Sequence, residues 1–312
     1  MNSVFLVSHS AIIAASHPLS WFQAVVLGLL QGVTELFPIS SLGHTVLFPT
    51  LFGWNALVKA QSNPESFWLA LVVMLHVGSA VGLLIYFWRD WIRIIGAFFH
   101  TLTTRRIESS SERLAWLIIA ASIPTGILGL VLEHPVRTAL AKPTAAAIFL
   151  MVNGVILIGA ERLRRRAEVR SLAIREGAAE DGFRRLDTLE YREAVAIGFF
   201  QATALIPGIS RDGIVMTGGL VRGLDNEDAA KFAFLLATPI ILAAGLFKFS
   251  DLTGPLGAGL RGQAFVAAAC AAAAAVVSVH YLLRYFKTNN LIPFGIYCLV
   301  FGAGMVVYNA VA

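Results

Sequence analysis

Six long apolar stretches do most to limit what this chain can fold into. Each holds about twenty mostly apolar residues, the length that an α-helix needs to cross a bilayer. Hydrophobic residues make up 57% of the 312 residues and charged residues 14%, and the mean hydropathy is +0.74. A soluble domain of average composition would carry roughly 25% charged residues, and a disordered chain would lack this apolar content. We therefore predict an all-α, polytopic integral membrane protein with six transmembrane helices, at residues 67–87, 114–132, 144–160, 229–249, 264–283 and 291–309.

Two further apolar stretches are interrupted. Residues 21–37 run into Pro-Ile-Ser-Ser-Leu-Gly-His (38–44), and residues 194–206 run into Pro-Gly-Ile-Ser-Arg-Asp-Gly (207–213). Proline ends a helix because it lacks the backbone donor and clashes with the preceding turn. Each stretch is too short to span comfortably, then turns, then becomes apolar again, which is typical of a re-entrant helix–loop–helix segment. Residues 1–16 predict a short N-terminal helix, with a cleaved signal peptide as the alternative.

The distribution of arginine predicts the orientation of the chain. Residues 88–113 carry five arginines and residues 161–193 include the run Arg164-Arg165-Arg166, whereas residues 133–143 have only Arg137 and Lys142. Loops rich in Lys and Arg stay in the cytoplasm, so both basic segments are expected there. These loops explain the net charge of +5, so we expect membrane lipids and no nucleic acid as partners.

The two interrupted stretches resemble each other. The sequence from Gln31 to Ser40 is similar to that from Gln201 to Ser210, and each is followed by three spans. The predicted orientation starts the two copies on opposite sides, so we expect one membrane domain (1–312) built as an inverted-topology repeat. Its parts are residues 20–160, a basic cytoplasmic loop at 161–193, and residues 194–309. Matched broken helices in such repeats mark a binding site near the membrane midplane. The alternative is two unrelated proline-kinked helices.

The first interruption carries side chains suited to catalysis. Gln31 and Glu35 are four residues apart and share one helix face, and an ionisable side chain in a membrane helix is by default a functional candidate. Ser40 or Ser41 can cap the returning helix. His44 follows closely enough to lie near the Ser41 hydroxyl, and a hydroxyl beside a histidine and a carboxylate can become a nucleophile. The alternative is a serine cap with a hydrogen-bonded histidine.

The second interruption suits an anion. Pro207-Gly208 turns the chain, Ser210 can cap the next helix, and Arg211 stands at its start. A helix N-terminus offers free N–H groups and a positive dipole, and the arginine fork matches phosphate oxygens. We therefore expect a phosphate cradle. The alternative is an intramembrane salt bridge between Arg211 and Asp212 or Glu35, since buried charges must pair.

Other polar features point less clearly to function. His76 is expected to be a packed, hydrogen-bonded residue of its span and not a ligand. Cys270 and Cys298 lie in apolar segments and indicate neither a disulfide framework nor a metal site. The sequence has no GxxxxGK[ST] motif and hence no P-loop.

The two interruptions resemble the signatures of the undecaprenyl-diphosphate phosphatase family, bacterial membrane enzymes linked with bacitracin resistance. The resemblance covers residues 20 to 306 approximately. It rests on an (E/Q)xxxE helix followed by PxSSxGH, here Gln31 to His44, and on PGxSR, here Pro207 to Arg211. The unrelated membrane phosphatases with a PSGH motif also need SRxxxxxHxxxD, and here Thr217 stands in place of that histidine.

This resemblance implies hydrolysis of undecaprenyl diphosphate to the monophosphate, which recycles the lipid carrier of cell-wall synthesis. It implies a multi-pass protein of the bacterial inner membrane, with the active site facing the outside, and a divalent cation, Mg²⁺ or Ca²⁺. It implies the following roles: Ser41 as nucleophile, His44 as its partner, Arg211 as diphosphate ligand, Glu35 and Gln31 for the metal or the proton chemistry, and Ser40, Gly208 and Ser210 as supporting substrate contacts.

Three positions depart from the commonest family pattern. Leu42 and Val215 stand where many members have threonine, and Asp212 stands where serine usually follows the arginine. Asp212 adds negative charge beside the cradle, which should weaken phosphate binding unless a cation offsets it. The rival function is a polyprenyl-phosphate transporter or flippase built on the same inverted repeat. A homodimer is left open.

Overall fold

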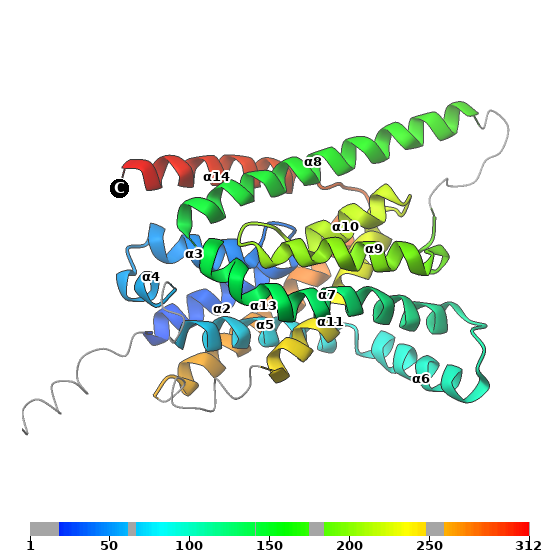
Figure 1. The fold of residues 1–312 in the computed structure, drawn as a ribbon, viewed down its shortest axis with the longest axis horizontal. Helices are drawn as coiled ribbons and strands as arrows, with labels where there is room; N and C mark the ends of the chain where they lie inside the picture. The colour runs from blue at the N-terminus through cyan, green and yellow to red at the C-terminus, as the bar shows by residue number, and fades with distance from the viewer. Residues whose placement is uncertain (1–18, 62–66, 141, 175–183, 248–258, 312) are drawn as a thin grey trace, which may run out of the picture.

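The computed structural model describes residues 19–61, 67–140, 142–174, 184–247 and 259–311 (Figure 1). This part of the chain is helical, and its one β-bridge, between Arg184 and Leu224, belongs to no strand. The short helix expected within residues 1–16 lies outside the described residues. The all-α prediction is confirmed.

Six helices of the described chain are long and apolar enough to cross a membrane, and each contains or closely matches a predicted span. They are α5 (Phe67–Tyr86), α7 (Ser110–Leu140), α8 (Pro143–Ile174), α11 (Asn226–Phe247), α13 (Arg261–Phe286) and α14 (Ile292–Val311). Pro124 and Pro135 lie inside α7 and Pro239 inside α11. Membrane helices tolerate such prolines because neighbouring groups satisfy the freed carbonyls.

Both basic segments between the predicted spans are partly helical in the structure. Residues 161–174, with the arginine run, continue α8, and the basic segment at 88–113 holds a further helix, α6 (Trp88–Thr104). Arginine and glutamate are good helix formers, and no proline or glycine stops α8 after Gly159. The change from apolar to charged sequence marks where a span can leave the bilayer and not where its helix ends.

Both interrupted stretches form a helix, a loop and a second helix. In the first, α2 (Trp21–Leu36) ends before Pro38 and α3 (Ser41–Leu51) follows, then α4 (Asn55–Gln61). In the second, η1 (Leu186–Thr188) precedes α9 (Tyr191–Gln201), η2 (Ala202–Leu205) and α10 (Arg211–Val221). The Arg184 side chain bonds both to Glu193 at the start of α9 and to the Arg222 carbonyl just after α10. The two ends of the second hairpin therefore lie together, which supports the prediction of re-entrance there.

Each half of the chain packs one helix of its interrupted stretch against a long helix of the other half. Helix α2 of the first half packs against α13 of the second, and α9 of the second packs against α7 of the first. Both contacts are close because a glycine faces a carbonyl: a Cβ at Gly28 would lie 2.3 Å from the Ala267 oxygen, and one at Gly198 would lie 1.9 Å from the Ala121 oxygen. Small residues let membrane helices approach in this way. The matched packing supports the inverted repeat, which stays a prediction.

Candidate active site

The two loops touch each other. The Ser40 hydroxyl accepts hydrogen bonds from the Gly208 amide (3.1 Å) and from the Gly43 amide (3.2 Å). Gly208 has a φ of +105°, and a Cβ there would lie 2.4 Å from the Ala146 carbonyl oxygen. Only glycine fits this turn, which explains its place after Pro207. The two interruptions therefore meet, as a binding site shared between them requires, and Glu35, Ser41 and Arg211 lie around one space.

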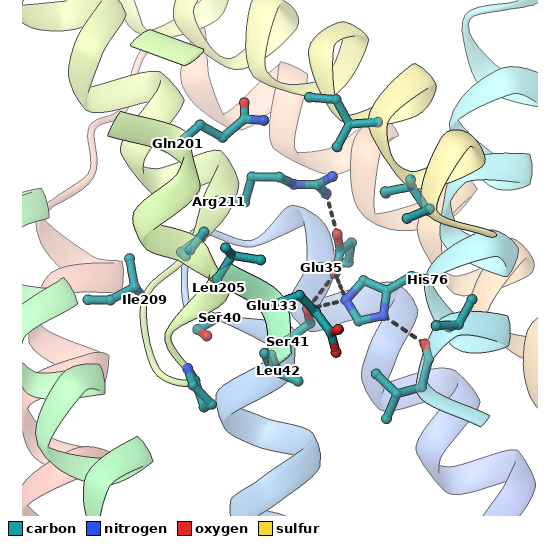
Figure 2. A pocket seen from close by; sticks show the side chains of 18 of the residues that line it. Glu35, Ser40, Ser41, Leu42, His76, Glu133, Gln201, Leu205, Ile209 and Arg211 are labelled. Atoms are coloured by element: carbon teal, nitrogen blue, oxygen red, sulfur yellow. Dashed lines mark hydrogen bonds and ion pairs between the residues drawn. The ribbon is translucent and has the colours of Figure 1, made fainter. Parts of the chain in front are cut away.

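Glu35 is the centre of this arrangement (Figure 2). Its carboxylate is buried near the end of α2 and accepts hydrogen bonds from the Ser41 hydroxyl and from Gln31 Nε2, the latter at 2.8 Å. Its other oxygen pairs with the Arg211 guanidinium. A buried carboxylate is tolerated only when its charge is paired and its lone pairs are filled, and here both conditions hold.

His76 on α5 belongs to this site, contrary to the expectation from sequence. Its Nε2 lies 3.3 Å from Glu35 Oε2 and 3.5 Å from Ser41 Oγ. Its Nδ1 lies 2.8 Å from the Val72 carbonyl oxygen, to which it must donate because a carbonyl can only accept. The ring is thereby oriented with Nε2 toward Ser41, and a quarter of the side chain is exposed, 24%. The available signal was a lone ionisable residue in an apolar span, which is by default a functional candidate.

No hydrogen bond joins His44 to Ser41, so the predicted Ser41–His44 pair is not formed. Its Nδ1 donates to the Ser40 carbonyl (2.8 Å), and its Nε2 lies 2.8 Å from the Tyr297 hydroxyl. The ring is fully buried and stacks with Tyr297 and Phe301. With Nδ1 donating, Nε2 can only accept the tyrosine proton, so no lone pair is left for Ser41. His44 holds Ser40, which has a φ of +69°, a costly backbone conformation for a residue with a Cβ.

Arg211 stands at the start of α10 as predicted, and it forms the salt bridge expected as the alternative to a phosphate cradle. Besides Glu35, its guanidinium bonds the Ala237 carbonyl at 3.3 Å, and its Nε lies 3.6 Å from Asp212 Oδ1. Asp212 is buried, and neither of its carboxylate oxygens has a hydrogen-bond partner in the described chain. Ser210 caps α10, with its hydroxyl accepting from the Gly213 amide at 3.1 Å. The Arg211 guanidinium is therefore the cationic partner of two buried carboxylates, those of Glu35 and Asp212.

A divalent cation at this site would need ligands from outside the protein. No group of three or more His, Cys, Asp or Glu side chains in the described residues could hold a metal ion. Gln31 Oε1, however, is buried and has no hydrogen-bond partner there, while Gln31 Nε2 bonds to Glu35. Mg²⁺ and Ca²⁺ prefer oxygen ligands, and Mg²⁺ is commonly bound by one or two protein oxygens together with phosphates.

A cavity of about 280 Å³ opens at this cluster. Glu35, Ser41, His76 and Arg211 line one part of it, together with Ser40 and Ser210 from the two loops. Most of the other lining side chains are apolar, and they include the following members of α5 and α11: Trp68, Leu69, Val72, Val73, Ile240 and Ile241. A space with charged and hydroxyl groups at one part and apolar walls elsewhere suits an amphipathic anion.

Comparison with known proteins shows the family of the chain. The model of the family described as "Bacitracin resistance protein BacA" matches residues 24–304. Undecaprenyl-diphosphatase 2 of Frankia alni is 51% identical, over 95% of this chain and 100% of its own length. Undecaprenyl-diphosphatase of Mycolicibacterium paratuberculosis is 50% identical, over 94% of this chain and 98% of its own. Undecaprenyl-diphosphatase of Acidiphilium cryptum is 41% identical, over 90% of this chain and 95% of its own length. With the family model covering most of the chain and these relatives aligned almost end to end, the chain belongs to the bacitracin resistance protein BacA family.

Proposed function

We propose that this membrane protein hydrolyses undecaprenyl diphosphate to undecaprenyl phosphate and phosphate. The observation that carries the proposal is the Ser41 hydroxyl, which donates to Glu35 and lies beside His76 Nε2 in the cavity that Arg211 lines. Relatives at 50% identity named undecaprenyl-diphosphatase support the substrate. The reaction recycles the lipid carrier of cell-wall synthesis, and a faster supply of carrier would counter bacitracin.

Binding of the diphosphate exchanges one anion for another at Arg211. The guanidinium that pairs with Glu35 in the free protein turns to the phosphate oxygens, which its planar fork matches two at a time. This exchange leaves Glu35 to its bonds with Ser41 and Gln31. The N-terminus of α10 adds a positive dipole at the same point. The apolar walls of α5 and α11 then take the first isoprene units, while the remainder of the tail lies in lipid.

Ser41 attacks the terminal phosphorus in the first step. The Oγ–P bond forms as the bond to the bridging oxygen breaks, and undecaprenyl phosphate leaves as an anion. The serine proton passes to the pair of His76 and Glu35, whose Nε2 and Oε2 lie 3.3 Å apart beside the hydroxyl. The pair then returns this proton to Ser41 Oγ as water attacks the phosphoserine, the Oγ–P bond breaks and inorganic phosphate leaves. The proton of the attacking water passes to the same pair and from there to solvent, so that the hydroxyl of Ser41 and the pair are restored. Arg211 stabilises the charge that develops on the phosphoryl oxygens in both steps.

A divalent cation, Mg²⁺ or Ca²⁺, forms part of the proposal. Glu35 and the unpartnered Gln31 Oε1 would hold it together with diphosphate oxygens. The buried charges support a need for it, because Asp212 already places a second carboxylate beside Arg211 before any substrate anion enters. A bound cation would offset this excess of negative charge and polarise the phosphoryl group.

The protein is a multi-pass membrane protein, and we propose that its site opens to the outside of the bacterial inner membrane. The support is the charge distribution, because the arginine-rich segments are expected in the cytoplasm and α2 then enters from the opposite side.

A flippase is the second candidate function, and the packing of α2 and α9 each against the opposite half favours it. A homodimer is also part of the proposal; mass photometry of the detergent-purified protein tests it.

The deciding experiment measures phosphate release from polyprenyl diphosphate by purified protein, with and without chelator. Ser41→Ala serves as the matched control, since it removes the nucleophile and little else. Release by the wild type that is lost in Ser41→Ala supports the proposal. A wild type that releases no phosphate, yet moves labelled polyprenyl phosphate across proteoliposomes, would establish the flippase in its place.

A further inference from the structure

Asn153 joins the loops of the two halves. It is a fully buried polar side chain on α8, a helix that packs against both α3 and α10. Its Nδ2 donates to the Pro38 carbonyl at 2.9 Å, and its Oδ1 accepts from the Ser210 amide at 3.0 Å. An amide nitrogen can only donate and an amide oxygen can only accept, so these two partners fix its orientation. Both polar ends of one side chain are thus used to connect the two interruptions.

The bonded atoms adjoin the reacting groups. Pro38 lies between Glu35 and Ser41 in the first loop, and Ser210 directly precedes Arg211 in the second. The hydrogen bond from the Gly208 amide to the Ser40 hydroxyl is a second link between the same loops. With two links, neither loop can slide or turn past the other without breaking a buried hydrogen bond. The position of Arg211 relative to Ser41 therefore depends on these links, and Asn153 supplies two of the hydrogen bonds.

We propose that Asn153 is a positioning residue, which fixes the distance between the diphosphate-binding Arg211 and the nucleophile Ser41. The inference rests on the proposed function and adds to it a residue that is not among those lining the cavity. The polar side chain persists in an apolar span because both its ends are bonded; without partners it would be costly there. Misplacing a reacting group by about 1 Å can reduce a rate on the order of a hundredfold.

Two substitutions of Asn153 distinguish the effects of its hydrogen bonds to Pro38 and to Ser210. Asn153→Leu keeps the approximate shape and removes both hydrogen bonds to the loops, together with a longer one from Nδ2 to Cys298 Sγ at 3.5 Å. Asn153→Asp keeps an acceptor for the Ser210 amide but replaces the donor to Pro38 with a second acceptor. The control is Ser122→Ala on α7, because the Ser122 hydroxyl bonds the Ile118 carbonyl of its own helix and connects no loops. We expect kcat to fall about tenfold to a hundredfold in Asn153→Leu and also to fall in Asn153→Asp. KM should change much less, and the control should keep both values.

Hydrogen–deuterium exchange measures how well Asn153 holds the second loop, and the measurement does not depend on catalytic activity. The backbone amides of residues 206–213 should exchange about tenfold faster in Asn153→Leu, since Ser210 loses its acceptor. In Asn153→Asp they should exchange as in the wild type, while kcat is still reduced. If Asn153→Leu does not yield folded protein, Asn153→Asp carries the test by itself.

A double-variant cycle distinguishes positioning from general stability. If Asn153 acts through Arg211, Asn153→Leu (or Asn153→Asp) should reduce kcat less in an Arg211→Lys background than in the wild type. Fully multiplicative effects, unchanged exchange in Asn153→Leu, or wild-type kcat in either Asn153 variant would each overturn the proposal. A wild type that releases no phosphate refutes the proposed function instead, and the exchange data then decide whether Asn153 orders the second loop.

Discussion

Replacing Arg211 with alanine should affect stability and catalysis for two separable reasons. The stability effect falls mainly on Asp212. Glu35 would still accept bonds from Ser41 and Gln31 and would still lie beside His76, whereas Asp212 would have neither a cation nor a hydrogen bond. Leaving one buried charge without its partner destabilises a protein by up to about 3–5 kcal/mol, and the cost is smaller where the carboxylate takes up a proton. Arg211→Ala should therefore unfold at a clearly lower temperature in detergent.

The catalytic effect comes from the transferring phosphoryl group. Removing one preorganised donor at a developing negative charge lowers kcat by about 10²–10³. Arg211→Lys should recover only part of this loss, because lysine keeps the charge but lacks the planar fork. Phosphate release from polyprenyl diphosphate, measured with saturating substrate, gives the comparison.

The double variant Arg211→Ala/Asp212→Asn separates the two effects. Neutralising Asp212 removes the charge left unpaired, so the unfolding temperature should return most of the way to that of Asp212→Asn alone, while hydrolysis stays lost. The reasoning is refuted if the double variant recovers activity, or if Arg211→Ala hydrolyses within tenfold of the wild type. A double variant as unstable as Arg211→Ala would show that Asp212 is not the group that Arg211 stabilises.

Three further predictions concern the other groups at the site. Ser41→Ala should lose nearly all phosphate release and form no phosphoserine detectable by mass spectrometry; substantial turnover would indicate attack by water. His76→Ala should lower kcat more than His44→Phe, which keeps the ring stacking at a site away from Ser41; the opposite order would return the catalytic role to His44. Glu35→Gln should lose more activity than Gln31→Ala, and chelator should abolish the wild-type reaction, because a carboxylate is the better Mg²⁺ ligand; activity that survives chelator would remove the metal from the proposal.

Local patterns predicted the helices and the loops. An apolar run of about twenty residues forms a helix in a bilayer whatever its neighbours, because its backbone must be bonded internally. Pro38 and Pro207-Gly208 likewise act on their own turns, which is why both interruptions were found. Helix ends were predicted less well, since the arginine run in α8 is as compatible with a helix as with a loop. The matching motifs indicated that the two loops should meet, and Ser40 contacts Gly208.

The roles of His44 and His76 could not be predicted from local sequence. The sequence by itself determined six spans, two interruptions and the supply of Glu, Ser, His and Arg at them, since these follow from properties of single residues and short segments. His44 and His76 have the same local geometry, each with Nδ1 bonded to the carbonyl four residues earlier. Only the packing of distant helices decided that Nε2 of His44 meets Tyr297 and that of His76 meets Ser41 and Glu35. Proximity in sequence favoured His44, but the position of a side chain relative to another helix is a property of the whole bundle.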